Sequence, residues 1–369
     1  MLSENTYFHL LRFALGIDES FNGEIAPDEW KTVYQLSERQ ALLGVVFDGV
    51  RRLQGSDAPS FPLLMQWTAI AEKIRGMNQQ FYAECERLTH LFETHGRKTA
   101  ILKGQANSLL YPNIYSRNPG DIDIYVEGGK DSVVKLLDEM GLLSKEELEL
   151  MNYHHVHLAE KQNDIEVEVH FRPSSGFYNP FCNSRLQKFL LEEVNKSALT
   201  KEGFYVPTMQ FALVMQLAHI QRHFIEEGIG LRQITDYYIL LTKSTPDDRA
   251  AIAAMLGNFG VKRFAAALMY ILKEIYHLDE GLMLCPHNEK NGKKLLAEII
   301  GGGNFGWYRG NRPQGNFANP MERKLYTLKR SSLYPREVNW YMLCSVGGFF
   351  AKLPQRIKYR SWSLQSIQK

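Results

Sequence analysis

The segment 121–126, Asp-Ile-Asp-Ile-Tyr-Val, alternates between two kinds of side chain in a chain whose apolar residues otherwise recur mostly at helical spacing. Residues two apart in a β-strand project to the same face of a sheet. Ile122 and Ile124 are therefore expected to point into a core, while Asp121 and Asp123 lie side by side at the start of the strand. The pattern predicts a strand that carries two neighbouring carboxylates.

The residues around this strand predict a compact mixed α and β unit over residues 98–175. Short apolar runs bounded by turn residues indicate strands, and longer runs with a period near 3.6 indicate helices. On these signals we expect strands at 99–102, 154–159 and 165–171, a polar hairpin turn at 161–164, one or two helical turns at 106–111, a loop at 112–120 and a helix at 130–140.

Helical spacing predominates on both sides of this unit. Residues 1–97 are expected to form a helical segment with a long helix over about 63–95. Residues 176–300 are expected to form a helical domain, and residues 301–369 a loop at 301–319 followed by a helical tail. Within the helical domain we expect helices at 209–224, 231–241, 250–256 and 262–276.

Charge and cysteine content narrow the classes of function. The 43 Lys and Arg residues against 41 Asp and Glu residues give a net charge of +2, which argues against a general nucleic-acid coat protein. The four cysteines are far apart and include no C-x-x-C pair, so neither a disulfide framework nor a zinc finger is expected, and a cytoplasmic location fits best. The N-terminus lacks a signal-peptide pattern, and no stretch approaches the roughly 20 apolar residues of a membrane span.

The two aspartates and the segment before them suit a site for a metal ion and phosphates. Two unneutralised carboxylates so close together repel each other, and a divalent cation between them removes that repulsion. Mg²⁺ prefers one or two carboxylates plus substrate phosphates, and a pair of such ions can clamp the two oxygens of a phosphoryl displacement. Gly104 follows an apolar strand and opens a helix, which exposes backbone N–H groups to phosphate, and Lys103 adds a positive charge.

A third acid is available on the strand predicted at 165–171. Glu166, Glu168 and His170 alternate with aliphatic residues, so they are expected to share one face. An acid at this place would complete the metal site or act as a general base toward an attacking hydroxyl group. The alternative is an exposed hairpin face, which would be charged in any case.

Lys103-Gly104, a spacer, Arg117 and then Asp121-Ile122-Asp123 resemble the lysine-glycine variant of the polymerase-beta nucleotidyltransferase superfamily. More narrowly, the chain resembles the bacterial family of uncharacterised nucleotidyltransferases, and it is more distantly similar to nucleotidyltransferases of abortive-infection toxin systems. The resemblance is specific over about residues 98–173 and looser over about 30–245. It implies an α+β fold with a polymerase-beta-like core, in which a small mixed β-sheet with helices is flanked by N- and C-terminal helical segments.

The resemblance also implies which carboxylates are catalytic and bind metal. The two aspartates of the family are matched by Asp121 and Asp123. Its third carboxylate commonly precedes a histidine by two positions, which points to Glu168, with Glu166 as the alternative. The chain departs from the superfamily pattern by having Lys-Gly in place of Gly-Ser and glutamate in place of the common third aspartate.

The activity implied by the resemblance is transfer of NMP from an NTP to a hydroxyl acceptor, with Mg²⁺ or Mn²⁺ as cofactor and release of pyrophosphate. The acceptor is unknown and would be a small molecule, a protein or an RNA. Lys103, Gly104 and Arg117 are expected to bind the nucleotide, with bracing of the loop as the other role for Arg117. Two alternatives stay open: a catalytically silent nucleotide-binding or protein-interaction module on the same fold, and a toxin-like enzyme acting on tRNA.

Other polar residues have plainer explanations. His219 and His223 lie four apart on a predicted helix without an H-E-x-x-H signature, so helix packing is favoured for His219, while the resemblance brings Arg222 or His223 near the nucleotide. Asp236 is expected to make a buried polar contact between helices, with orientation of a catalytic group as the alternative.

Two further clusters are expected to be structural. His155 and His157 should share a strand face while His154 points away, which favours a structural role over a metal cluster. The basic, aromatic tail resembles an amphipathic surface helix, and packing against the helical domain is favoured over contact with a membrane surface or a partner. Its residues are Trp340, Phe349, Phe350, Lys352 and Arg356.

Overall fold

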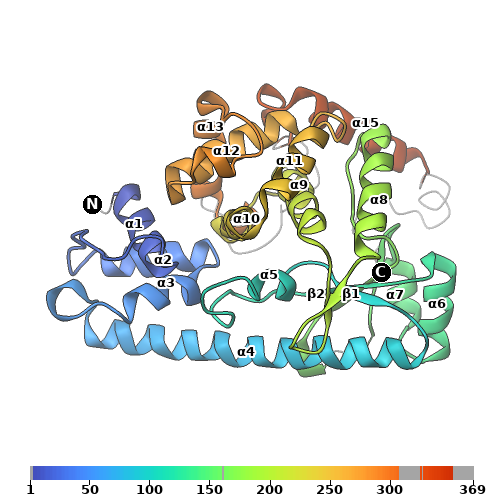
Figure 1. The fold of residues 1–369 in the computed structure, drawn as a ribbon, viewed down its shortest axis with the longest axis horizontal. Coiled ribbons are helices and arrows are strands. Elements are labelled where there is room, and N and C mark those ends of the chain that lie inside the picture. The colour runs from blue at the N-terminus through green and yellow to red at the C-terminus, as the bar shows by residue number, and fades with distance from the viewer. Residues whose placement is uncertain (1–2, 160–161, 307–324, 326, 352–369) are drawn as a thin grey trace.

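The computed structural model describes residues 3–159, 162–306, 325 and 327–351 of the 369-residue chain (Figure 1). The fold is a mostly helical α+β arrangement around a small mixed β-sheet, which confirms the predicted fold class. Figure 1 shows the long helix α4 (Phe61–Thr94) along one edge of the molecule, with the helices of the C-terminal half gathered on the opposite side of the sheet.

The main sheet has four strands in the order β1-β2-β4-β3. Strand β2 pairs antiparallel with β1 and parallel with β4, and β3 pairs antiparallel with β4. All four strands fall within the ranges predicted for them, at Thr99–Ile101, Ile122–Val126, His155–His157 and Val167–His170 for β1 to β4. A separate two-stranded ladder, β5 (Ala198–Leu199) with β6 (Tyr205–Val206), was not predicted.

The remaining helices surround this sheet. In chain order they are α1 (Glu4–Ala14), α2 (Trp30–Arg39), α3 (Leu43–Val50), α5 (Gln105–Ser108), α6 (Gly129–Glu139), α7 (Lys145–Leu150), α8 (Pro180–Val194), α9 (Met209–Glu226), α10 (Leu231–Lys243), α11 (Pro246–Met255), α12 (Lys262–Tyr276), α13 (Glu289–Gly302) and α15 (Pro335–Ala351).

One face of the sheet packs on α4 and α6, as the alternation in β2 predicts. Ile122 and Ile124 are fully buried, and they belong to a hydrophobic cluster that also contains Phe92 of α4 and Leu137 of α6. This cluster extends beyond residues 98–175, because the second half of α4 and Phe204 belong to it. The apolar face is thereby covered, and the acidic side chains of β2 are directed to the other face.

Further segments differ from the sequence prediction. The loop expected at 301–319 begins later, because α13 continues to Gly302, and residues 307–319 lie outside the described residues. Helix α13 itself was missed. So was α8, although its start has a readable signal: Pro180 stands in the first turn, and the side chain of Asn179 accepts hydrogen bonds from the next backbone N–H groups.

Candidate functional site

Asp121 and Asp123 lie at the start of β2, beside the turn that leaves β1. The Asp123 side chain is 2% exposed, whereas that of Asp121, which precedes the strand, is 39% exposed. The backbone N–H of Leu102 donates to the carbonyl oxygen of Asp123, which ties the end of β1 to the acidic strand. The pair therefore offers one carboxylate inside the protein and one that is open to a ligand.

Lys103 contacts both aspartates. Its Nζ lies 3.3 Å from Oδ1 of Asp121 and forms a close ion pair with Oδ2 of Asp123. Burial alone would lower the pKa of Lys103, but Asp121, Asp123 and Glu168 outweigh burial and raise that pKa above its ordinary value. The lysine is therefore a permanent cation between the two acids.

Gly104 makes the turn between β1 and α5 possible. Its backbone has φ +62° and ψ −99°, a region that only glycine adopts without strain. Its carbonyl oxygen accepts a hydrogen bond from the N–H of Ser108, which closes the single turn of α5. The glycine thus sets the position of Lys103 relative to the aspartates.

Replacing Gly104 with alanine is expected to lower the free energy of unfolding by about 1–3 kcal/mol, because the added Cβ makes this conformation strained. The new Cβ would meet only the carbonyl oxygen of Asp121, at an ordinary 3.6 Å, so the cost is conformational rather than steric. Chemical denaturation measures it. Gly76→Ala in α4 is the matched control and should raise stability by about 0.5–1 kcal/mol. Equal effects of the two substitutions would contradict the argument.

Glu168 lies opposite Asp123 in the parallel pairing of β2 with β4. Its Oε2 is 2.8 Å from Nδ1 of His155 and 3.2 Å from Nε2 of His170. Burial by itself would raise the pKa of Glu168, but these two histidines and Lys103 hold that pKa well below its usual range. The carboxylate is therefore ionised and held in place from two sides.

Glu166, the alternative third acid, faces outward. Its side chain is 50% exposed and contacts Nδ1 of His157 at 3.1 Å. The Glu168 side chain is 18% exposed, and one of its oxygens, one from Asp123 and one nitrogen of His170 all lie within 4.8 Å of one another. This geometry favours Glu168 over Glu166 as the partner of the aspartates.

His170 joins the two acidic strands. Its Nε2 is 3.0 Å from Oδ1 of Asp123 and 3.2 Å from Oε2 of Glu168. Burial would lower the pKa of His170, but the hydrogen bonds to Asp123 and Glu168 raise it to about 9. The imidazole is therefore a second cation within the acidic cluster.

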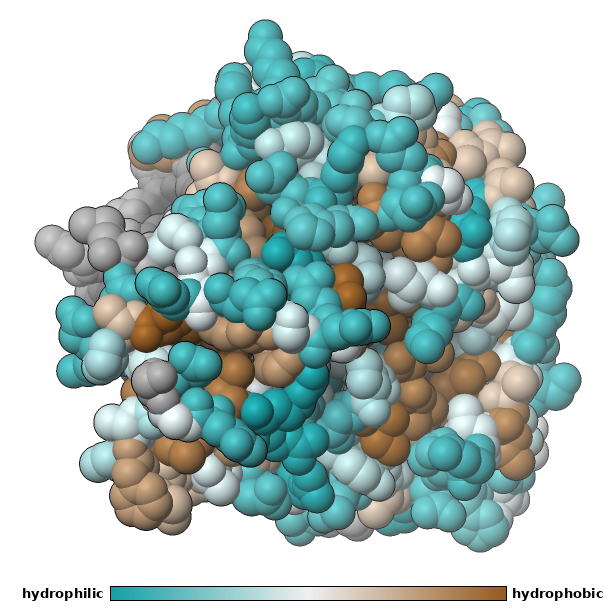
Figure 2. All heavy atoms as spheres, turned by 60° about the vertical axis from the view of Figure 1, so that its left-hand side comes forward, coloured by the Kyte–Doolittle hydropathy of each residue, from teal (hydrophilic) through white to brown (hydrophobic). Residues whose placement is uncertain are grey.

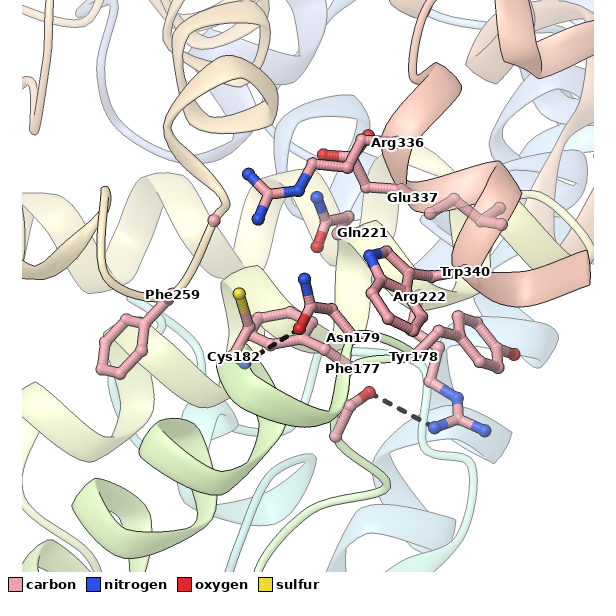
Figure 3. A pocket seen from close by; sticks show the side chains of 13 residues that line it. Phe177, Tyr178, Asn179, Cys182, Gln221, Arg222, Phe259, Arg336, Glu337 and Trp340 are labelled. Atoms are coloured by element: carbon pink, nitrogen blue, oxygen red, sulfur yellow. Dashed lines mark hydrogen bonds between the residues drawn. The ribbon is translucent and has the colours of Figure 1, made fainter. Parts of the chain in front are cut away.

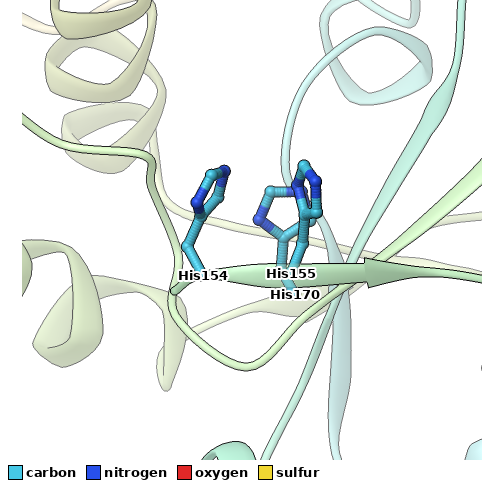
Figure 4. A group of neighbouring side chains, drawn as sticks. All are labelled: His154, His155 and His170. Carbon is cyan, nitrogen blue, oxygen red and sulfur yellow. The ribbon is translucent and has the colours of Figure 1, made fainter. Parts of the chain in front are cut away.

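His154 joins the other histidines and does not point away from them, contrary to the prediction from strand alternation. It precedes the first residue of β3, so the two-residue period of the strand does not govern it. Figure 4 shows the side chains of His154, His155 and His170 on the same side of β3, and one nitrogen from each lies within 4.8 Å of the others.

Asn152 determines the tautomer of His155. Its Oδ1 accepts the backbone N–H groups of His154 and His155 at 3.2 and 3.1 Å, which orients the amide so that Nδ2 donates to Nε2 of His155 at 2.6 Å. The imidazole proton is then on Nδ1, the atom that faces Glu168. The histidines near β3 thus hold the third carboxylate in place.

Arg117 is buried in a bidentate pair with Asp236 of α10. Its Nε and Nη2 donate to the two carboxylate oxygens at 2.8 and 2.9 Å, and the hydroxyl of Tyr111 donates to the same carboxylate at 2.7 Å. This is the loop-bracing role that the sequence left open for Arg117. Asp236 contacts the 112–120 loop rather than a second helix, so it links the helical domain to the segment that carries Asp121.

Arg232 is a residue of this region to which the sequence prediction assigned no role. It is one helical turn before Asp236 on α10, is 9% exposed, and its Nη1 donates to the carbonyl oxygen of Asn118 at 3.0 Å. Its guanidinium lies over Gly120, directly before Asp121. The sequence does contain a signal for this position, because Arg232 stands four residues before Asp236 and the two therefore share one face of the helix.

Helix α9 carries two histidines within electrostatic reach of Lys103. The rings of His219 and His223 are 4.2 Å apart, and burial, the other histidine and Lys103 lower the pKa of His219 well below its usual range. His219 therefore faces the site as a neutral imidazole. Arg222 is turned elsewhere, since it donates to Glu226 and to backbone carbonyl oxygens at residues 175 and 176.

One pocket of the described residues is separate from the acidic cluster. It lies between α8, α9 and α15 and is mainly apolar, with Phe177, Tyr178 and Trp340 in its lining (Figure 3). Trp340 is partly buried and lines this pocket beside α8 and α9, in keeping with the packing favoured for this residue of the tail. The side chains of Phe349, Phe350, Lys352 and Arg356 lie outside the described residues.

Among the described residues, no helix is long and apolar enough to cross a membrane. On the face seen in Figure 2, hydrophobic side chains are interspersed with hydrophilic ones.

A small mixed sheet with two aspartates at the start of a central strand, a third carboxylate in register beside the second of them and a lysine-glycine turn define a protein of the nucleotidyltransferase-like α+β class. The sequence pattern of the family described as "Uncharacterised nucleotidyltransferase" matches residues 26–277, more than half of the chain. The chain belongs to this family, which confirms the resemblance inferred from the sequence.

Similarity to individual proteins is slight. Among solved structures, an antigenic nucleotidyltransferase-like protein from Paracoccidioides brasiliensis matches with 12% sequence identity and a TM-score of 0.32. The match covers 57% of this chain and 94% of that chain. No curated protein matches the sequence.

Proposed function

We propose that the chain is a Mg²⁺-dependent nucleotidyltransferase that transfers NMP from an NTP to a hydroxyl group. The acceptor oxygen forms a bond with the α-phosphorus, the bond to the β-phosphate oxygen breaks, pyrophosphate leaves, and the hydroxyl proton is released to water. Family membership supports the reaction class. The observation that carries the proposal is the register of β4 against β2, which places Glu168 opposite Asp123, and Asp123 follows Asp121 by two residues.

The three carboxylates fit a magnesium ion. Mg²⁺ binds oxygen ligands and is usually held by one or two carboxylates together with substrate phosphates. Asp123 and Glu168 supply oxygens that lie within 4.8 Å of each other, and Asp121, which shares Lys103 with Asp123, adds an exposed carboxylate that leaves room for phosphates. When bound there, the ion would neutralise charge on the phosphates during transfer.

Lys103 and Glu168 have roles that follow from their charges. With a cation on the aspartates, the Nζ of Lys103 is released from its ion pairs and lies within reach of a phosphate oxygen. A carboxylate whose pKa lies far below its usual range is a weak base. The low pKa therefore supports a ligand role for Glu168 rather than that of a general base.

Calorimetric titration of the wild-type protein with each of the four NTPs, with and without Mg²⁺, tests the proposal. We expect binding of at least one NTP that requires Mg²⁺, and loss of that binding in Asp121→Asn. Glu166→Gln is the matched control and should bind as the wild type does, because Glu166 faces outward.

The product assay separates the proposal from its main alternative. With the NTP that binds, we expect release of pyrophosphate once an acceptor is supplied from cell extract, and none from Asp121→Asn. NTP binding without product from any acceptor fraction would favour the catalytically silent module. Failure of the wild type to bind any NTP would contradict a nucleotide site altogether.

A further inference from the structure

We propose that Arg232 forms the binding subsite for the terminal phosphates of the nucleotide, a part of the site that the sequence motif does not include. The inference rests on the proposed function. It starts from a contrast between two arginines, Arg117 and Arg232, that contact the same loop.

The guanidinium of Arg117 is paired with a carboxylate inside the protein, whereas the guanidinium of Arg232 is not. The charge of Arg117 is neutralised by the bidentate pair with Asp236. Arg232 makes hydrogen bonds only to the carbonyl oxygens of Asn118 and Pro119, its buried Nε has no hydrogen-bond partner, and no carboxylate of the described residues lies within 4.0 Å of it.

A guanidinium that is nine-tenths buried without a counter-ion is costly to keep in a folded protein. Burial and the neighbouring Arg117 lower the pKa of Arg232 to about 10, against the opposite effect of Asp236 and Asp121, and the guanidinium keeps its positive charge at neutral pH. Such a charge is stabilised when an anion from outside completes its hydrogen bonds.

The position of Arg232 indicates which anion. Its guanidinium lies over Gly120, next to Asp121, whose exposed carboxylate belongs to the proposed metal site. Burial lowers the pKa of His219 most, and Lys103 and Arg232 lower it further, so both cations lie within electrostatic reach of the same imidazole. The planar fork of arginine donates two parallel hydrogen bonds to phosphate. With the α-phosphate at the metal, Arg232 is placed for the phosphates beyond it.

The test compares binding of NTP and of inorganic tripolyphosphate, both with Mg²⁺, to the wild type, Arg232→Gln and Arg232→Lys. Arg232→Gln should weaken both ligands on the order of ten- to a hundredfold, the loss expected when charge-assisted hydrogen bonds to phosphate are removed. Arg232→Lys should be intermediate, because it keeps the charge but not the fork. The matched control is Arg249→Gln, since Arg249 also donates to backbone carbonyl oxygens, at the far end of α10.

A stability measurement separates binding from a structural role. Without ligand, Arg232→Gln should unfold at the same temperature as the wild type or higher, because it removes an uncompensated buried charge. A lower unfolding temperature together with unchanged ligand affinity would overturn the inference. If the wild type binds NTP and Arg232→Gln binds it equally well, the inference is overturned and the proposed function stands. If the wild type binds neither ligand, the inference and the proposed function are both overturned. Tripolyphosphate binding that depends on Arg232, without any NTP-specific affinity, would leave the anion subsite standing and remove the nucleotidyltransferase proposal.

Discussion

Replacement of Asp236 with alanine is expected to lower the free energy of unfolding by about 3–5 kcal/mol. The substitution leaves the guanidinium of Arg117, which is 7% exposed, buried without its counter-ion, and it removes the acceptor of the Tyr111 hydroxyl. Removal of one partner from a buried pair costs more than the pair itself contributes, since the remaining charge is desolvated and uncompensated. Urea denaturation followed by circular dichroism measures the loss.

Two controls define the origin of that effect. The double variant Arg117→Met/Asp236→Leu removes both charges and should regain most of the lost stability. Glu139→Ala breaks an exposed pair with Lys135 on α6 and should change stability by less than about 1 kcal/mol. A loss in Asp236→Ala as small as that of Glu139→Ala would show that the buried pair does not hold the helical domain to the loop.

Lys103→Met is expected to destabilise the protein by about 3 kcal/mol when divalent cations are removed with a chelator. Asp123 would remain buried with His170 as its only close cation, and Asp121 and Glu168 would repel it. Addition of Mg²⁺ should then stabilise the variant more than the wild type, because in the wild type the ion has to displace the lysine. The gain grows as RT ln(1 + [Mg²⁺]/Kd), about 2.7 kcal/mol at a hundredfold excess over Kd.

Denaturation with and without Mg²⁺ measures both parts of this expectation. Lys135→Met, on the exposed face of α6, is the matched control and should behave as the wild type in both conditions. Equal stabilisation of Lys103→Met and wild type by Mg²⁺ would mean that the lysine and the metal ion do not compete for the same carboxylates.

The sequence alone determined those features that depend on local periodicity. The alternation at 121–126 predicts a strand whose two isoleucines are buried, and both are fully buried. The period of the helix predicted at 262–276 is regular enough to give both ends of α12. Such patterns are local because a strand or a helix repeats its buried positions every two or three to four residues. The lysine-glycine turn and the pair of aspartates are also local patterns, and these two motifs indicated the family.

Which of the candidate side chains meet depends on how distant elements pack together. Asp236 lies 119 residues from Arg117, and no local pattern pairs them. The choice of Glu168 over Glu166 depends on the register of β4 against β2, which is set by packing between strands separated by a long crossover. His154 stands with the other histidines because the chain bends before β3, and Arg232 reaches the acidic site because α10 packs against the 112–120 loop. Contacts of this kind depend on how elements pack in space, so a local pattern can supply the residues of a site but not their partners.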